Sequence, residues 1–256
     1  MSTHPANPTA CLLVIGNEVL SGRTRDLNIH FIAGRLGNIG LPLREVRVIP
    51  DIAEVIVRTV NEVRARYDQV FTTGGIGPTH DDITAECISM AFGVPWEPHP
   101  EAFAMMTARY PQGEFNAARQ RMATMPRGAK LIPNPVSFAP GFSVGNVHVM
   151  AGVPRIMQGM WEGLEPTLPR GRPVVSRAVH ATRLLEGLIA AGLSAIQDRH
   201  PDLDLGSYPY ERPDGNGVAI VAKGVDADEA EAAVAEVAEL MRGLGLTPMM
   251  GEPPAL

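Results

Sequence analysis

Apolar runs of strand length alternate with helical patterns through the first third of the chain. Residues 10–15 read ACLLVI, a continuous apolar run typical of a strand that is buried on both faces. After it, Ile29, Ile32 and Leu36 recur at the spacing of one helix face. The same order repeats, with further strands expected at residues 43–49 and 69–73. This alternation predicts an α/β fold built on a doubly wound, mostly parallel sheet.

An aspartate stands at the start of each helix that follows these strands. Asp26, Asp51 and Asp82 occupy positions where an N-cap is expected, and Asp51 with Glu54 has the spacing of a capping box. Capping is therefore the plain structural interpretation of Asp51 and of Asp82, against which any functional role must be weighed.

The rest of the chain continues the fold and then changes in composition. One or two helices are expected over 99–123, interrupted near Pro111 and Gly113, then short strands over 129–150 and a helix over 154–165. A segment rich in proline, 166–173, is typical of a linker. Beyond it the pattern predicts strands at 174–182, 204–210 and 217–223 and helices at 184–198 and 226–243, the second capped by Asp226 or Asp228. We therefore expect two domains, residues 1–168 and a small α+β domain at 174–250 with the order β-α-β-β-α.

The bulk composition excludes several classes of function. The net charge is −6 and no basic stripe is present, so we expect no nucleic-acid partner. No apolar stretch has the length of a membrane span, and the first ten residues lack the pattern of a secretion signal. Cys11 and Cys87 lie in apolar runs and form no Cys-x-x-Cys pair, which predicts buried free thiols. Together these features predict a cytoplasmic protein without a membrane partner.

The segment from Thr72 to Thr84, TTGGIGPTHDDIT, carries the clearest functional signal. It leaves a buried strand and opens a helix, and three glycines in four positions allow the backbone to approach a ligand closely. A turn that feeds a helix N-terminus offers free N–H groups, which bind phosphate. The segment contains no lysine and matches neither the Walker A pattern nor Gly-x-Gly-x-x-Gly. It therefore predicts a phosphate site that is neither a P-loop nor a dinucleotide-dehydrogenase fingerprint.

Asp81 and Asp82 are unexpected neighbours for a phosphate. At about 4 Å and an effective dielectric of about 20, each carboxylate repels a unit negative charge by about 4 kcal/mol. A helix N-terminus offsets only about 0.3–1 kcal/mol per charge. The difference leads to the hypothesis that a divalent cation bridges the carboxylates and the phosphate.

Two further segments are expected at the same edge of the sheet. The loop from Gly16 to Gly22 follows the first strand, where Glu18 and Ser21 are able to reach a metal or a phosphate, although an ordinary connecting loop is an equally good interpretation. Asp51 follows the second strand, where capping is the simpler interpretation on spacing alone. His80 is a candidate acid or phosphate ligand, and an exposed turn residue is its simpler interpretation.

These residues together resemble the CinA-type (competence/damage-inducible protein A) branch of the MoaB/Mog family. The central segment resembles that branch's TGGxGPTxDDxT signature, and Ile15–Gly22 followed by Asn28 resembles its opening motif. Later matches are Asn134, Ala139–Phe142, Gly152–Pro154 with Met157 and Met160, and Gly206–Pro209. The resemblance covers nearly the whole chain. Because the chain ends at Leu256, we expect it to lack the amidohydrolase domain of full-length CinA-type proteins.

The resemblance implies two functions of different class. One is a metal-dependent pyrophosphatase that cleaves an ADP-ribose- or FAD-like dinucleotide, with Mg²⁺, Mn²⁺ or Co²⁺ as the cofactor. The other is a non-catalytic protein that binds molybdopterin or its adenylylated form; a scaffold with an inactive site is a weaker third interpretation. We also expect a homo-oligomer. The candidate catalytic residues are Asp51, Asp81 and Asp82; the candidate metal ligands are Glu18, Asp81 and Asp82; the candidate ligand-binding residues are Gly16, Asn17, Glu18, Ser21, Asn28, Thr73, Gly74, Gly75, Gly77, Pro78 and Thr79.

Overall fold

A computed structural model describes residues 6–213 and 215–253 of the chain. The chain divides into two compact units, Met1–Gly171 and Arg172–Leu256. Part of the amino-terminal segment on which the localisation was predicted, residues 1–5, lies outside the described residues.

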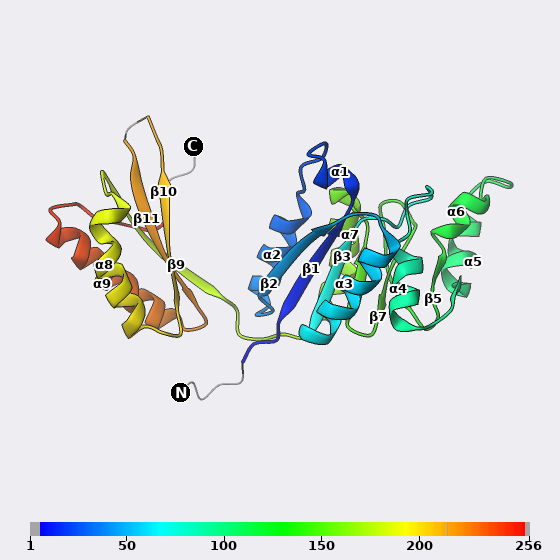
Figure 1. The fold of residues 1–256 in the computed structure, drawn as a ribbon, viewed down its shortest axis with the longest axis horizontal. Helices are drawn as coiled ribbons and strands as arrows, with labels where there is room; N and C mark the ends of the chain where they lie inside the picture. The colour runs from blue at the N-terminus through cyan, green and yellow to red at the C-terminus, as the bar shows by residue number, and fades with distance from the viewer. Residues whose placement is uncertain (1–5, 214, 254–256) are drawn as a thin grey trace. The chain divides into compact units, whose positions relative to one another are not determined.

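The first unit is built on a six-stranded sheet with the order β2-β1-β3-β8-β7-β6 (Figure 1). The pairs β1–β2, β1–β3 and β3–β8 are parallel, whereas β7 pairs antiparallel with both β8 and β6. The strands are β1 (Ala10–Ile15), β2 (Leu43–Ile49), β3 (Gln69–Thr73), β6 (Lys130–Ile132), β7 (Gly141–Val144) and β8 (Val147–Met150). The mostly parallel α/β sheet is therefore confirmed.

Helices cover both faces of this sheet, which buries the central strands completely. The helices are α1 (Asn17–Leu20), α2 (Asn28–Asn38), α3 (Ala53–Arg66), α4 (Thr84–Phe92), α5 (Pro100–Arg109), α6 (Ala117–Arg121) and α7 (Pro154–Leu164), followed by a 3₁₀ turn, Glu165–Thr167. Every residue of β1 is buried, because its side chains alternate between two separate cores.

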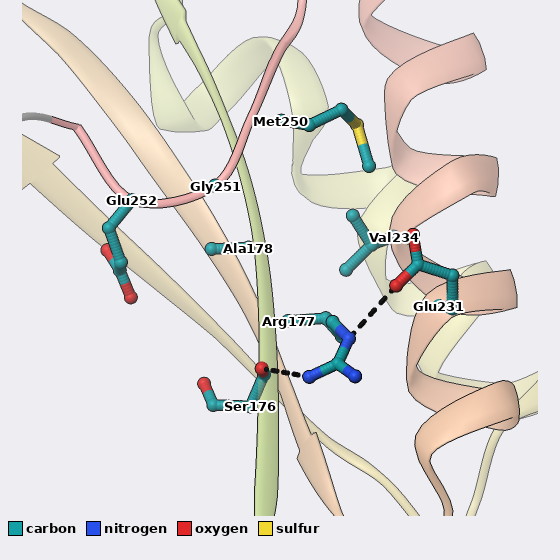
Figure 2. A pocket seen from close by; sticks show the side chains of 8 residues that line it. All are labelled: Ser176, Arg177, Ala178, Glu231, Val234, Met250, Gly251 and Glu252. Atoms are coloured by element: carbon teal, nitrogen blue, oxygen red, sulfur yellow. Dashed lines mark hydrogen bonds and ion pairs between the residues drawn. The ribbon is translucent and has the colours of Figure 1, made fainter.

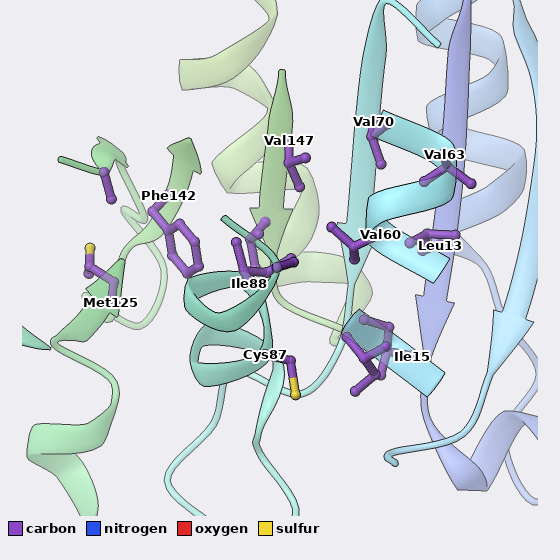
Figure 3. Close-up of a cluster of buried hydrophobic side chains, with 14 of the residues drawn as sticks. Leu13, Ile15, Val60, Val63, Val70, Cys87, Ile88, Met125, Phe142 and Val147 are labelled. Atoms are coloured by element: carbon purple, nitrogen blue, oxygen red, sulfur yellow. The ribbon is translucent and has the colours of Figure 1, made fainter. Parts of the chain in front are cut away.

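The two cores lie on opposite faces of the sheet. In the first, Leu13 and Val70 from the sheet meet Val60 of α3 and Ile88 of α4 (Figure 3). The second joins side chains of β1 to those of α2 and α7, around the fully buried Trp161. A separate two-stranded ribbon, β4 (Trp96–Pro98) with β5 (Thr124–Pro126), brackets α5 and α6 and was not predicted from the sequence.

The second unit is a four-stranded antiparallel sheet with two helices. The sheet has the order β10-β11-β9-β12, with β9 (Val175–Thr182), β10 (Asp204–Tyr210), β11 (Gly217–Gly224) and β12 (Met249–Met250). Its helices, α8 (Glu186–Arg199) and α9 (Ala227–Gly243), share a core with β9 and β11. The predicted order β-α-β-β-α is confirmed, and β12 adds one short strand to it.

Two predictions from composition can be compared with the structure. Cys11 and Cys87 are free and buried, as predicted, and burial raises the pKa of the Cys11 thiol to about 12 and that of Cys87 to about 11. Both thiols are therefore protonated and unreactive at neutral pH. Across residues 6–213 and 215–253, no helix is both long enough and apolar enough to span a membrane.

Candidate functional site

The candidate residues lie where the direction of the chain reverses across the sheet. From β1 the chain passes through α2 to β2 on one side, and β3 then pairs with β1 on the other side. The loops after β1 and β3 therefore diverge at the carboxyl edge of the sheet. Ligands of open α/β sheets bind in the crevice that such a divergence leaves.

Two residues of the glycine turn require glycine for steric reasons. Gly74 has φ +102°, and a Cβ there would lie 2.1 Å from the carbonyl oxygen of Ile15. Gly75 has φ +68°, and its Cβ would lie 2.2 Å from Oγ1 of Thr84. The turn is therefore pressed against the end of β1 on one side and against the start of α4 on the other.

One N–H group of the turn is hydrogen-bonded within the fold, and the next three are not. The N–H of Gly74 donates to the carbonyl of Met150 at 3.2 Å, so the prediction that this amide binds phosphate is wrong. Among the residues that the structure describes, the N–H groups of Gly75, Ile76 and Gly77 have no acceptor. Three consecutive backbone donors are thus available to an anion.

Thr84 fixes the turn, although it was not among the predicted site residues. Its buried hydroxyl donates to the carbonyl of Gly74 at 3.0 Å, and its N–H donates to the carbonyl of Gly75 at 3.0 Å. A threonine at the first position of a helix carries no special signal in one sequence. Only the fold shows that it ties α4 to the turn.

Asp82 stabilises the loop and not the helix. Its Oδ2 accepts hydrogen bonds from the N–H of Thr79, at 2.8 Å, and from the Thr79 hydroxyl. Helix α4 begins only at Thr84, and its N-cap residue makes no side-chain cap, so the capping interpretation of Asp82 is wrong. His80 is 98% exposed, in agreement with the simpler of its two interpretations.

Asp51 connects two loops of the edge. The predicted capping box is wrong, because helix α3 has no side-chain cap and Oδ2 of Asp51 accepts the N–H of Asn17 at 2.8 Å. The residues around Gly16 and Asn17 form a one-turn helix, α1, where a plain loop was expected. Burial raises the pKa of Asp51, and the charges of Glu18 and Asp81 raise it further. Glu18 folds back over Gly16, where a Cβ would lie 2.6 Å from the carboxylate.

The other predicted residues differ in the contacts they make at the carboxyl edge of the sheet. Asn28 is buried and donates to the carbonyl of Gly152 at 2.8 Å, which places it beside the turn because Gly152 packs on Gly74. Its Oδ1 and the buried hydroxyl of Thr73 have no hydrogen-bond partner among the described residues. Such buried polar atoms normally have a partner, so both are available to water or to a ligand. Ser21, by contrast, uses its hydroxyl on the carbonyl of Glu18 at the end of α1.

A small cleft, ≈ 10 Å³ in volume, adjoins the turn. Gly75, Ile76, Gly77 and Asp82 line one side of it. Its lining also includes two residues that were not predicted, Trp96 of β4 and Arg121 of α6, and several apolar side chains. The cleft therefore brings free amides and a guanidinium together.

The predicted metal ligands do not assemble a complete site by themselves. Among residues 6–213 and 215–253, no three His, Cys, Asp or Glu side chains lie close enough together to hold a metal ion. Glu18 and Asp81 are near enough to Asp51 for their charges to raise its pKa. These carboxylates fit a cation only if the ligand supplies part of its coordination, as Mg²⁺ accepts from phosphates.

The second unit has a separate pocket of ≈ 430 Å³ between β9, α9 and the segment after β12. Arg177 and Glu231 form an ion pair at 3.0 Å inside it (Figure 2). Both side chains are substantially exposed, so this ion pair contributes little to stability.

Two protein families match the chain, one for each unit. Residues 11–170 match the family described as "Probable molybdopterin binding domain". Residues 173–247 match the family described as "FAD synthase, middle domain". The two matches meet at the same place in the chain as the boundary between the compact units.

Similar proteins agree with these matches. A CinA-like protein of Thermomicrobium roseum is 36% identical over 251 residues, which is 91% of this chain and 59% of that protein. A CinA-like protein of Geobacter sp. is 42% identical over 63% of this chain and 40% of its own length, so this chain spans only part of those relatives. A protein of Pyrobaculum calidifontis is 36% identical over 79% of this chain and 81% of its own.

A solved structure agrees as well. The protein CinA from Thermoplasma acidophilum, described as being of unknown function, has a TM-score of 0.60 and 32% identity over 64% of this chain and 99% of that one. The family match covers more than half of the chain and coincides with the unit that carries the glycine turn. The chain therefore belongs to the molybdopterin-binding domain family, in its CinA-like branch.

Proposed function

We propose that the edge formed by the loops after β1 and β3 binds a phosphate-bearing ligand, and that the protein hydrolyses the pyrophosphate bond of an ADP-ribose- or FAD-like dinucleotide with the help of a divalent cation. The observation that carries the proposal is the set of three free N–H groups, from Gly75 to Gly77, in the turn that continues into Asp81 and Asp82. The charges of Glu18 and Asp81 act in turn on Asp51. Amides attract a phosphate, whereas the acids repel it unless a cation accompanies it.

Each residue has a distinct role in this proposal. The N–H groups of Gly75, Ile76 and Gly77 hold one phosphate, and Thr84 keeps the turn in place. Glu18, Asp81 and Asp82 would hold the cation together with phosphate oxygens, and the cation would neutralise charge on the phosphates. Asp51, which is held at Oδ2 by the N–H of Asn17, would orient the attacking water.

The match of the second unit to a FAD synthase domain supports a nucleotide-like ligand. Non-catalytic binding of molybdopterin or its adenylylated form is the second candidate, and one observation favours it. The described residues contain no complete three-ligand metal group, which a carrier does not need. The family description itself also names molybdopterin.

A turnover assay separates the two candidates. The purified protein is incubated with ADP-ribose or FAD and Mg²⁺, Mn²⁺ or Co²⁺, and AMP is measured. We expect AMP to form, to depend on the metal, and to be lost in Asp51→Asn and Asp82→Ala. Asp228→Asn, which removes an exposed acid of α9, is the matched control and should retain full turnover. Absence of AMP with every metal, together with a pterin that co-purifies, would establish the carrier instead.

A further inference from the structure

Arg121 lines the same cleft as the glycine turn. It ends helix α6, 39 residues after Asp82, and no pattern in the sequence connects the two. In the fold, one terminal nitrogen of its guanidinium donates to the backbone carbonyl of Asp82 at 3.3 Å. Arg121 therefore contacts the loop that carries the predicted site.

An aromatic ring holds the guanidinium of Arg121 in position. It stacks over the ring of Trp96, with 5.1 Å between Cζ and the ring centroid. Trp96 is fixed in turn, because its indole N–H donates to the carbonyl of Thr124 at 3.0 Å. A planar cation that is held by stacking loses little conformational freedom when it binds a further group.

Much of the hydrogen-bonding capacity of Arg121 is unused. Its Nε is buried and has no acceptor among the described residues. Within the same part of the chain, no carboxylate lies within 4.0 Å of its guanidinium, whereas Arg119, two residues earlier, pairs with Glu114 at 3.1 Å. A buried donor without an acceptor is costly, and a cation beside free backbone N–H groups fits an anion that arrives from solution.

We propose that Arg121 binds the second phosphate of a pyrophosphate-containing ligand whose first phosphate lies on the N–H groups of Gly75–Gly77. Both sets of donors line the same cleft, and the planar fork of arginine matches two oxygens of a phosphate. The site is thereby selective for diphosphates over monophosphates. This inference rests on the proposed phosphate site, and it distinguishes a dinucleotide or an adenylylated pterin from a pterin with one terminal phosphate.

The test compares two adenine nucleotides that differ by one phosphate. AMP and the non-hydrolysable α,β-methylene-ADP are titrated calorimetrically with Mg²⁺ into the wild type and three variants. We expect the wild type to prefer the diphosphate by at least about 10-fold, and Arg121→Gln to weaken diphosphate binding by about 10- to 100-fold with little change for AMP. Arg121→Lys, which keeps the charge without the fork, should fall between them. Arg119→Gln, on the same helix, should bind both nucleotides as the wild type does.

The outcomes that overturn the inference are separate from those that overturn the proposed function. If the wild type binds both nucleotides and Arg121→Gln weakens neither, or weakens both equally, the assignment of Arg121 to a second phosphate is refuted while the phosphate site stands. If the wild type binds neither nucleotide, the phosphate site itself is refuted, and this inference with it. Circular dichroism melting of each variant distinguishes lost binding from lost folding. If Arg121→Gln does not fold, the same comparison of diphosphate and AMP binding is made with Arg121→Lys.

Discussion

Acid should destabilise the first unit through a single buried imidazole, that of His148. This side chain on β8 is only 7% exposed and stacks on Phe71 with 5.1 Å between ring centroids. Its two nitrogens make hydrogen bonds to the hydroxyl of Ser143 at 2.8 Å and to Oε1 of Gln69 at 2.7 Å. Burial lowers the pKa of His148 from 6.5 to about 4, so the imidazole is neutral in the folded protein at neutral pH.

The sign and size of the effect follow from linkage. Between pH 6.5 and about 4 the unfolded chain binds a proton at this position and the folded protein does not, so stability falls as the pH falls. The full shift corresponds to about 3 kcal/mol of unfolding free energy, of which about 2 kcal/mol is lost by pH 5. Above pH 6.5 the position makes no pH-dependent contribution.

Urea unfolding followed by tryptophan fluorescence measures this effect in the first unit alone. Both tryptophans of the chain, Trp96 and Trp161, belong to that unit. The loss of unfolding free energy between pH 7.5 and pH 5 should be smaller by about 2 kcal/mol in His148→Gln than in the wild type. His80→Gln removes an imidazole that is 98% exposed and is the matched control. Equal losses in the wild type and His148→Gln would refute the argument.

Substitutions at three further positions test the turn and one helix. Gly75→Ala forces a side chain into φ +68° and into contact with Thr84, so we expect it to cost about 1–3 kcal/mol of unfolding free energy by tryptophan fluorescence and to abolish AMP binding by calorimetry. Thr84→Val removes the buried hydrogen bond to Gly74 and should cost about 1–3 kcal/mol while weakening AMP binding; unchanged binding would contradict its role in holding the turn. Asp226→Ala removes the N-cap of α9 and should destabilise the second unit by about 1 kcal/mol in far-UV circular dichroism melting, whereas Asp226→Asn should cost less.

Local patterns predicted the elements well because their causes lie within a few residues. The apolar run of β1 and the helix periodicity of α2 are such patterns, and so is the expected cap of α9 by Asp226. Asp26 accepts the N–H of Ile29, but it lies one residue before the N-cap of α2, which is Leu27. Strands of two or three residues, such as β12, were missed because they are too short to show alternation.

The site was predicted less completely because its contacts span long stretches of sequence. The spacing of Asp51 favours a helix cap, yet its partner is the N–H of Asn17, 34 residues earlier. Gly74 belongs to a turn whose composition is typical of phosphate binding, yet its own N–H extends the pairing of β3 with β8. Arg121 reaches the cleft only because α6 and β5 fold back beside α4. Such partners depend on how the sheet is assembled, and a single sequence does not show this.

The hydrogen bond between Asn17 and Asp51 has a consequence for what happens when a ligand arrives. It fastens the one-turn helix that carries Glu18 to the end of β2. A ligand or cation that draws the Asp51 carboxylate toward itself competes with that N–H and so releases the helix. A ligand bound at Asp51 would then allow Glu18 to move away from Gly16. The affinity of the site for a second charged ligand would depend on whether the first is already bound.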